Sequence, residues 1–139
     1  MRRGLVTGGC GFIGSNLVRE LVEQGWTVDV VDDMSSGNLS LLDGLKIRVV
    51  PAGLLEVFYS DKAADPENRM QEEVHVIQGD FADHRVLKNI SDEKYDVVFH
   101  QAAIPRVSFS VENPSLTTDV NISSKNCIRF FIFSLWWRR

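Results

Sequence analysis

Four glycines near the start of the chain have a spacing that suits phosphate binding. Gly8, Gly9, Gly11 and Gly14 lie in the segment TGGCGFIG, which contains both a G-x-G-x-x-G and a G-x-x-G-x-x-G pattern. Residues without a Cβ let a strand turn sharply and let the backbone approach a pyrophosphate closely. A helix that begins here would add unpaired N–H groups and a partial positive charge. The pattern predicts a dinucleotide phosphate site; the alternative is a plain flexible turn.

An acidic pair follows the glycines at the distance, roughly 20 residues, that a dinucleotide site requires. Asp32 and Asp33 close the segment Trp26 to Val31, whose β-branched residues predict a strand. A carboxylate at this place accepts hydrogen bonds from the adenosine ribose and repels a 2′-phosphate. Asp32 therefore favours NAD over NADP, and the alternative is that Asp32 and Asp33 only cap a turn.

The elements around these residues form a strand, helix and strand unit. Gly4 to Thr7 predicts a short buried strand, and Ile13, Leu17 and Leu21 recur at the spacing of a buried helix face. Gly25 stands where a C-terminal glycine cap belongs. The context of the glycine loop is therefore the one that its phosphate-binding role needs.

A second unit follows, with a strand at Val74 to Ile77, a helix capped by Asp83 and ending near Ile90, and a strand at Tyr95 to His100. Residues 46–73 between the units mix apolar and charged pieces, and we expect a surface insertion with a short helix. The fold class is α/β, the N-terminal half of a Rossmann doubly wound parallel sheet. We expect the first strand in the centre, the second and third on one side and the fourth on the other.

Composition limits the function classes. The 139 residues, 44% of them hydrophobic, fit one globular domain, and the net charge of −4 argues against nucleic acid as a partner. Cys10 and Cys127 have no spacing typical of a metal site, so we expect no metal and two reduced thiols in a cytoplasmic protein. The apolar run Phe130 to Trp137 is far shorter than the roughly 20 residues of a membrane span.

Four blocks, TGGCGFIGSNLV, VVDDMSSGNL, GDFAD and HQAAIPRVSFS, together resemble the extended short-chain dehydrogenase/reductase family. Within it they are most similar to the NAD-dependent nucleotide-sugar epimerases and dehydratases, above all the UDP-hexose 4-epimerases. The resemblance implies an NAD-binding Rossmann half-domain over residues 1–123, with 46–73 as the insertion and 124–139 as a tail outside the family pattern.

The resemblance also implies individual roles. Residues matching Asp80 and Phe81 lie along the adenine in that family, those matching 101–103 follow the fourth strand beside the cofactor, and the one matching Asn121 approaches the nicotinamide. The predicted cofactor-binding residues are Gly8, Gly11, Phe12, Ile13, Gly14, Asp32, Asp33, Ser36, Gly37, Asp80, Phe81, Gln101, Ala102, Ala103 and Asn121.

We expect no catalytic residue in the chain, because the family's catalytic serine or threonine and its Tyr-x-x-x-Lys pair find no match in the sequence. Tyr59 and Lys62 do not substitute, since they are spaced Y-x-x-K and precede the third strand. We also interpret His100 as a packing residue and Cys10 as a small loop residue rather than a nucleophile.

Several functions remain open at this point. The first is the NAD-binding portion of a truncated 4-epimerase that binds its nucleotide sugar only as the full-length enzyme. The others are a dehydratase or reductase of the same family, and a non-catalytic dinucleotide-binding module. The apolar tail, 130–137, predicts self-association or a protein partner, because no single helix or strand face can bury all its large side chains.

Overall fold

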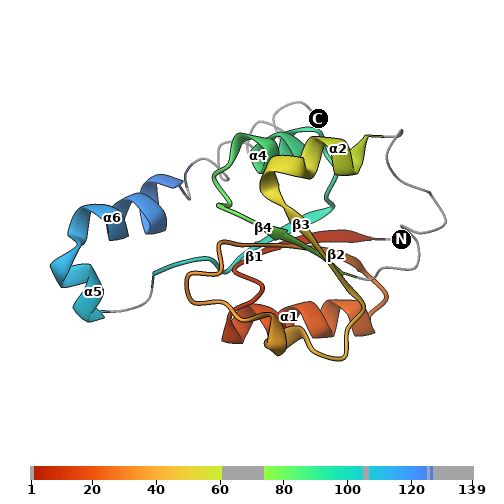
Figure 1. The fold of residues 1–139 in the computed structure, drawn as a ribbon, viewed down its shortest axis with the longest axis horizontal. Coiled ribbons are helices and arrows are strands. Elements are labelled where there is room, and N and C mark those ends of the chain that lie inside the picture. Colours follow the sequence, from red (N-terminus) through yellow and green to blue (C-terminus); the bar gives the residue numbers. More distant parts are fainter. Residues whose placement is uncertain (1, 61–73, 105–106, 125, 127–139) are drawn as a thin grey trace.

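A computed structural model describes residues 2–60, 74–104, 107–124 and 126 (Figure 1). Its centre is a five-stranded sheet with the order β3-β4-β2-β1-β5. Every neighbouring pair is parallel. The strands are β1 (Arg3–Thr7), β2 (Thr27–Asp32), β3 (Ile47–Pro51), β4 (Val74–Gln78) and β5 (Val97–His100). The predicted α/β class and the predicted order of the four strands are confirmed.

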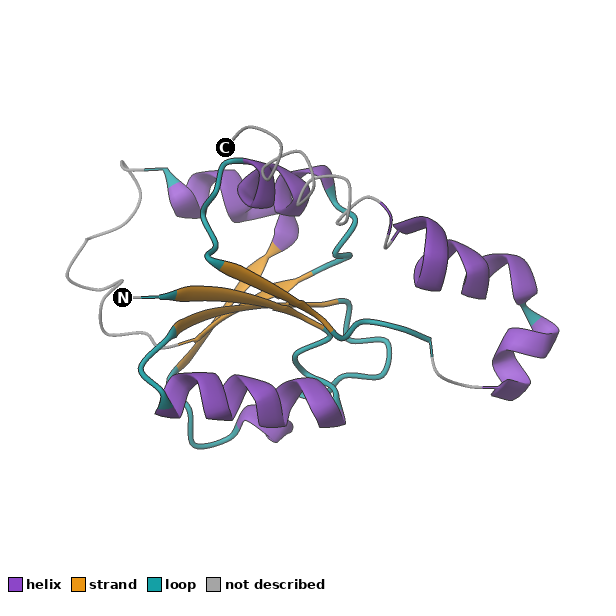
Figure 2. Ribbon diagram, turned by 180° about the vertical axis from the view of Figure 1, so that it is seen from behind, coloured by secondary structure: helices purple, strands orange, loops and turns teal. Residues whose placement is uncertain are grey.

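Helices cover both faces of this sheet (Figures 1 and 2). Helix α1 (Phe12–Glu23) lies on one face, and α2 (Leu55–Tyr59) and α4 (His84–Ser91) lie on the other. Beyond the carboxyl ends of the strands, α5 and α6 project away from the sheet. The remaining elements are η1 (Leu39–Leu42), η2 (Ala52–Leu54), α5 (Val107–Glu112), α6 (Pro114–Thr118) and the π-helical turn η3 (Asp119–Ser123).

Alternating side chains of the central strands build two apolar layers. Leu5 of β1 and Val31 of β2 pack in the cluster beneath α2 and α4, whereas the following Val6 and the preceding Val30 pack in the cluster against α1. All four are essentially inaccessible to solvent. A parallel strand with helices on both faces needs apolar residues on both sides, which explains the continuous apolar runs in the sequence.

One expectation about the fold was wrong. The first part of segment 46–73, predicted as a surface insertion, forms the edge strand β3, whose register pairs Ile47 with Val74. Val50 and Phe58 of the same segment are buried in the core. An edge strand needs only one buried face and tolerates a proline at its end. Arg48 and Pro51 therefore made the sequence of β3 look unlike a buried strand. The predicted short helix is α2.

The predicted helix ends are confirmed. Asp83 caps α4, because its Oδ1 accepts a hydrogen bond of 2.8 Å from the Arg85 N–H. Gly25 has a φ of +78° just after α1, as a C-terminal glycine cap requires. None of the described helices is long and apolar enough to span a membrane. Lys62, Cys127 and the tail 130–137 lie outside the described residues, so the predictions made for them stay predictions.

Candidate dinucleotide site

The glycine loop joins β1 to α1 at the carboxyl edge of the sheet. Gly8 has a φ of +70°, and its N–H donates to the Val31 carbonyl over 2.7 Å. A Cβ on Gly8 would lie 2.8 Å from the backbone nitrogen of Ala102, in the segment after β5. The loop is therefore packed directly against the predicted 101–103 segment, and only glycine fits at position 8.

Two further glycines serve the packing of the protein itself. A Cβ on Gly9 would lie 2.6 Å from Cγ1 of Val30, and a Cβ on Gly14 would lie 2.7 Å from the Cα of Gly9. These contacts bring α1 close to the strands, the role expected of the last glycine in such a loop. Their replacement would thus change the fold before it changed any ligand contact.

Gly11 is different, because neither its backbone conformation nor its packing requires a glycine. Its φ is −83°, and a Cβ there would meet only the Gly8 carbonyl oxygen, at 3.3 Å. Any residue adopts such a backbone, so the missing side chain leaves space on the outer side of the loop. A pyrophosphate approaching the loop would use this space.

The start of α1 is open to a negatively charged ligand. Gly11 caps the helix without a side-chain hydrogen bond, and the first turn contains no acidic residue. Phe12 and Ile13, the first residues of the helix, are 78% and 68% exposed. The first turn of the helix therefore contains no carboxylate that would neutralise the partial positive charge of the helix end.

The Asp32 carboxylate faces this loop from the end of β2. Its Oδ2 accepts a 2.9 Å hydrogen bond from the Cys10 N–H, and its Oδ1 accepts one of the same length from the Met34 N–H. A Cβ on Gly37 would lie 2.6 Å from Oδ1, so the glycine lets the next loop close over the carboxylate. Each oxygen keeps one more acceptor position, which a ribose hydroxyl could use.

The neighbouring predicted residues are placed less specifically. Asp33 and Ser36 are exposed in the loop after β2, where Asp33 accepts a hydrogen bond from the Ser35 N–H over 2.9 Å. Asp80 is exposed after β4 and accepts from the Ala82 N–H over 2.8 Å. The ring of Phe81 packs in the core, 4.9 Å from the His100 ring centroid. Its side chain therefore has a packing role.

The segment after β5 is tied to β1 and to the C-terminal helices. The Gln101 N–H donates to the Thr7 carbonyl over 3.0 Å, and Ala103 is exposed further along. The Asn121 amide pairs in both directions with the backbone of Ile104, at 2.8 and 3.1 Å. In this structure Asn121 holds the loop, and its predicted approach to a nicotinamide stays a prediction.

Two side chains that resemble catalytic groups have other surroundings. Burial and the nearby Asp32 raise the pKa of the Cys10 thiol to about 12, so the thiol stays protonated. Nδ1 of His100 lies 2.7 Å from the Thr7 hydroxyl, and its ring meets the Phe81 ring edge to face. Both environments agree with the packing roles predicted from the sequence.

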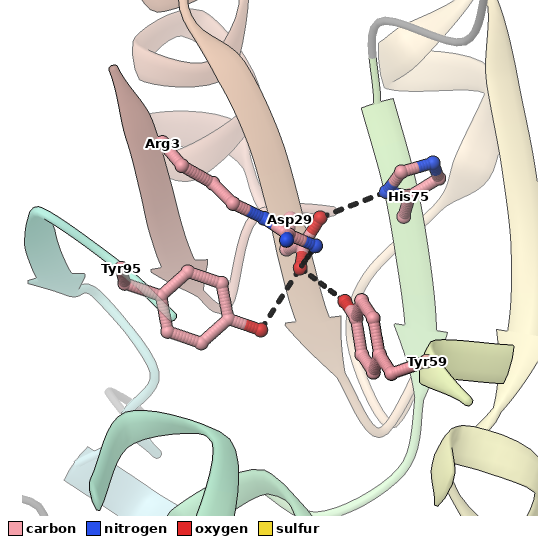
Figure 3. Close-up of polar contacts among 5 residues, drawn as sticks. All are labelled: Arg3, Asp29, Tyr59, His75 and Tyr95. Carbon is pink, nitrogen blue, oxygen red and sulfur yellow. Dashed lines mark hydrogen bonds and ion pairs between the residues drawn. The ribbon is translucent and has the colours of Figure 1, made fainter. Parts of the chain in front are cut away.

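Sequence analysis missed a second polar cluster, centred on Asp29 in the middle of β2 (Figure 3). The Asp29 side chain is fully buried. It accepts from Arg3 over 2.8 Å, from Tyr95 over 2.9 Å and from Tyr59, and it lies 2.9 Å from Nδ1 of His75. The sequence feature that could have indicated this cluster is the carboxylate inside the apolar strand TVDVVD, because a buried carboxylate needs a polar partner.

This cluster shifts the proton affinities of its members. Burial alone would raise the pKa of Asp29, but the hydrogen bond from His75 and the charge of Arg3 lower it below its usual value. Burial, followed by the Asp29 charge, raises the pKa of Tyr59 and of Tyr95 well above 10. The two phenols therefore act as hydrogen-bond donors and not as bases.

The parallel sheet, the glycine loop at the start of α1 and the acidic end of β2 define a dinucleotide-binding domain of the Rossmann type. The model of the NAD dependent epimerase/dehydratase family matches residues 4–127, and the chain belongs to this family. The resemblance inferred from the four sequence blocks is thereby confirmed, and the family's dependence on NAD agrees with the cofactor that Asp32 predicts.

Individual relatives agree with this assignment. A protein described as a putative UDP-glucose 4-epimerase of Methanocaldococcus jannaschii is 30% identical over 118 residues, which are 85% of this chain and 30% of the relative. The crystal structure of a UDP-glucose 4-epimerase from Stenotrophomonas maltophila, with bound NAD and formylated UDP-arabinopyranose, has a TM-score of 0.67 and 26% identity. The match covers 95% of this chain and 33% of the Stenotrophomonas chain.

A third comparison gives the same proportions. A UDP-N-acetylglucosamine 4-epimerase from Methanobrevibacter ruminantium has a TM-score of 0.67 and 28% identity. The match covers 94% of this chain and 33% of the epimerase chain. The chain thus spans about a third of the length of the proteins it matches.

Proposed function

We propose that this chain is the NAD-binding portion of a nucleotide-sugar 4-epimerase-like enzyme, in a cytoplasmic setting, and that it has no turnover alone. The observation that carries the proposal is the Asp32 carboxylate, held 2.9 Å from the Cys10 N–H of the glycine loop. A carboxylate so placed accepts ribose hydroxyls and repels a 2′-phosphate. The UDP-sugar epimerases among the relatives support the nucleotide-sugar class.

The residues present fit NAD. The open N-terminus of α1 suits the pyrophosphate, Gly11 leaves room for it, and Asp32 would bind the adenosine ribose. Bound NAD would supply the hydride acceptor for a sugar carbon. The contribution of this chain is to bind and orient the cofactor at the carboxyl edge of the sheet.

The proposed inactivity follows from the lack of a suitable base. Oxidation of a sugar hydroxyl needs a group that takes its proton, and a positioned base contributes roughly 10² to 10⁴ in rate. Tyr59 cannot take this role, because its hydroxyl donates to Asp29 and burial raises its pKa. In the family that base belongs to the Tyr-x-x-x-Lys pair, which has no match here.

The cofactor assignment is tested by calorimetric titration of the chain with NAD and with NADP. We expect tighter binding of NAD, because the 2′-phosphate would meet Asp32. Gly11→Val should weaken both, since its side chain would occupy the pyrophosphate space. Gly53→Val is the matched control, because a Cβ on Gly53 meets nothing within 4 Å. Equal or tighter binding of NADP would refute the role of Asp32.

The inactivity is tested by conversion of UDP-glucose to UDP-galactose with NAD supplied, using a full-length epimerase as the positive control. We expect no turnover. Turnover that disappears in Tyr59→Phe would show that the catalytic residue is Tyr59, and turnover of any kind would refute the proposal that the chain only binds the cofactor.

A further inference from the structure

A polar pocket of about 190 Å³ lies between α2 and α4, on the sheet face opposite to α1. Helix α4 lines it with Arg85, Lys88 and Asn89, and α2 lines it with Glu56 and Tyr59. Side chains three or four positions apart share one face of a helix, so each helix turns a polar face toward the pocket. No residue of the glycine loop lines it.

The pocket is locally cationic in a chain that is acidic as a whole. Of the residues that the structure describes, Arg85, Lys88 and Lys94 line it together with one carboxylate, Glu56, whereas the net charge of the chain is −4. The ammonium of Lys94 lies 4.6 Å from the ring centroid of Tyr59, which places it at the pocket wall. Cations gathered in a recess attract a small anion more strongly than the same cations spread over a surface.

Arg85 and Lys88 each form an ion pair with an aspartate, and each still has N–H donors for a ligand. Nη1 of Arg85 lies 3.2 Å from Oδ2 of Asp83, and Nζ of Lys88 lies 2.9 Å from Oδ2 of Asp92. A guanidinium carries five N–H donors and an ammonium three. Each side chain can therefore keep its carboxylate partner and still donate into the pocket.

Asn89 provides the independent observation that points to a ligand. Its side chain lines the pocket, yet the residue is only 6% exposed. Within the described residues its amide forms no hydrogen bond, yet it is not among the fully buried unpaired groups, so its small accessible part faces the pocket. Its neighbours in α4, Leu87 and Ile90, are buried in the apolar core. The amide therefore places a donor and an acceptor at the wall of the pocket, where a bound polar group could use them.

We propose that this pocket binds the phosphate group of a small phosphate monoester, such as a sugar phosphate, separately from the dinucleotide site. The guanidinium, the two ammonium groups and the Asn89 amide offer more donors than the two oxygens of a carboxylate can accept. A phosphate has three free oxygens and more charge, and Arg and Lys are its usual partners. Glu56 supplies an acceptor for a hydroxyl of the esterified group.

The first test is titration of the full chain with inorganic phosphate, followed by NMR of the backbone and side-chain amides. We expect saturable shifts at Arg85, Lys88 and the Asn89 side chain. Lys88→Gln with Lys94→Gln should weaken the binding by at least about tenfold, because charge-assisted hydrogen bonds are lost. Shifts confined to residues 8–15, or an unchanged affinity in the double variant, would refute the site.

Two controls separate this pocket from other cationic surfaces. Lys46→Gln makes the same charge change at an exposed residue that does not line the pocket, and it should leave phosphate affinity unchanged. Gly11→Val blocks the outer side of the glycine loop and should leave unchanged the phosphate affinity that is measured from the shifts at Arg85 and Lys88. A loss of the shifts at Arg85 and Lys88 in Gly11→Val would assign the phosphate to the dinucleotide site and overturn the proposal, whatever the outcome of the NAD titrations.

Asn89→Leu distinguishes a ligand-binding amide from a structural one. The substitution should raise the thermal midpoint without phosphate, because it removes a buried amide that lacks a protein partner. It should at the same time weaken phosphate binding severalfold. A lower midpoint combined with unchanged phosphate affinity would show that the amide serves the fold, which would overturn the proposal.

Discussion

The carboxyl edge and the buried interior of the sheet use acidic residues of the same strand in opposite ways. Asp29, in the middle of β2, is fully buried and contacts four side chains from other parts of the chain (Figure 3). Asp32, at the end of β2, accepts hydrogen bonds from two backbone N–H groups and lies beside the open glycine loop.

The difference shows how to distinguish a structural carboxylate from a binding one. A carboxylate has about four acceptor positions. Around Asp29, side chains of this chain occupy them, so no ligand has access and the charge serves the fold. Around Asp32, two positions remain, and the first turn of the neighbouring helix contains no other acidic residue. The predictions below test this contrast, beginning with the largest effect.

Asp29→Ala should lower the free energy of unfolding by about 3–5 kcal/mol, the usual cost of removing one partner of a buried ion pair. The Arg3 guanidinium would lose its carboxylate, and two buried phenols would lose their acceptor. Urea denaturation followed by circular dichroism measures the change. Asp29→Asn is the matched variant, since it keeps the shape and an acceptor oxygen, and a loss below about 1 kcal/mol in Asp29→Ala would contradict the structural role.

Tyr59→Phe should lower stability by about 1.5–3 kcal/mol, the range for a hydrogen bond to a charged group. The ring remains to pack against Phe58 and Arg3, so only the hydroxyl is lost. NAD affinity should stay unchanged, because Tyr59 is not part of the glycine loop region. A weaker affinity for NAD at equal stability would break the separation between the two regions.

Saturation with NAD should stabilise the chain by about 1.4 kcal/mol at a concentration ten times the dissociation constant, by mass action on the folded state. Thermal unfolding with and without NAD measures the shift. Gly11→Val should lose the stabilisation, whereas Gly53→Val and Tyr59→Phe should retain it. An equal shift in all three variants would place NAD binding elsewhere in the molecule.

The turn after β1 and the position of Asp32 at the end of β2 could be predicted from the sequence because their main requirements are local. Gly8 and Gly14 are fixed by the turn and by close packing, and Asp32 follows its strand directly. The strand, the turn and the helix follow one another in the chain, so their spacing can be read from the sequence, although Gly8 also packs against the distant Ala102. Asp83 and Gly25 were predictable for the same reason, since a helix end is decided by its nearest residues.

The interior cluster and the edge strand β3 could not be predicted in the same way. Asp29 contacts His75 and Tyr95, which are far from it in the sequence, and no residue spacing indicates these contacts. The strand Ile47–Pro51 forms because it pairs with the open edge of β4. This pairing depends on the tertiary structure and not on the local sequence. The pocket between α2 and α4 depends on the same arrangement, because α2 follows β3.

The smallest expected effect is spectroscopic, and it concerns the only two tyrosines of the chain, Tyr59 and Tyr95. Burial, with the Asp29 charge, raises the pKa of both phenols above the ordinary value of 10.0, so the folded state holds these protons more tightly than the unfolded state. Stability from this source is therefore complete below pH 10 and decreases as the pH rises above it. Near pH 10 the folded chain should show no tyrosinate absorbance, and the band should appear only together with unfolding, whereas the same titration in urea should show ordinary ionisation. In Tyr59→Phe the remaining band reports Tyr95 alone and should behave in the same way. Tyrosinate that forms near pH 10 while circular dichroism still shows a folded chain would mean that the phenols are open to solvent, and the contrast between the two regions would not hold.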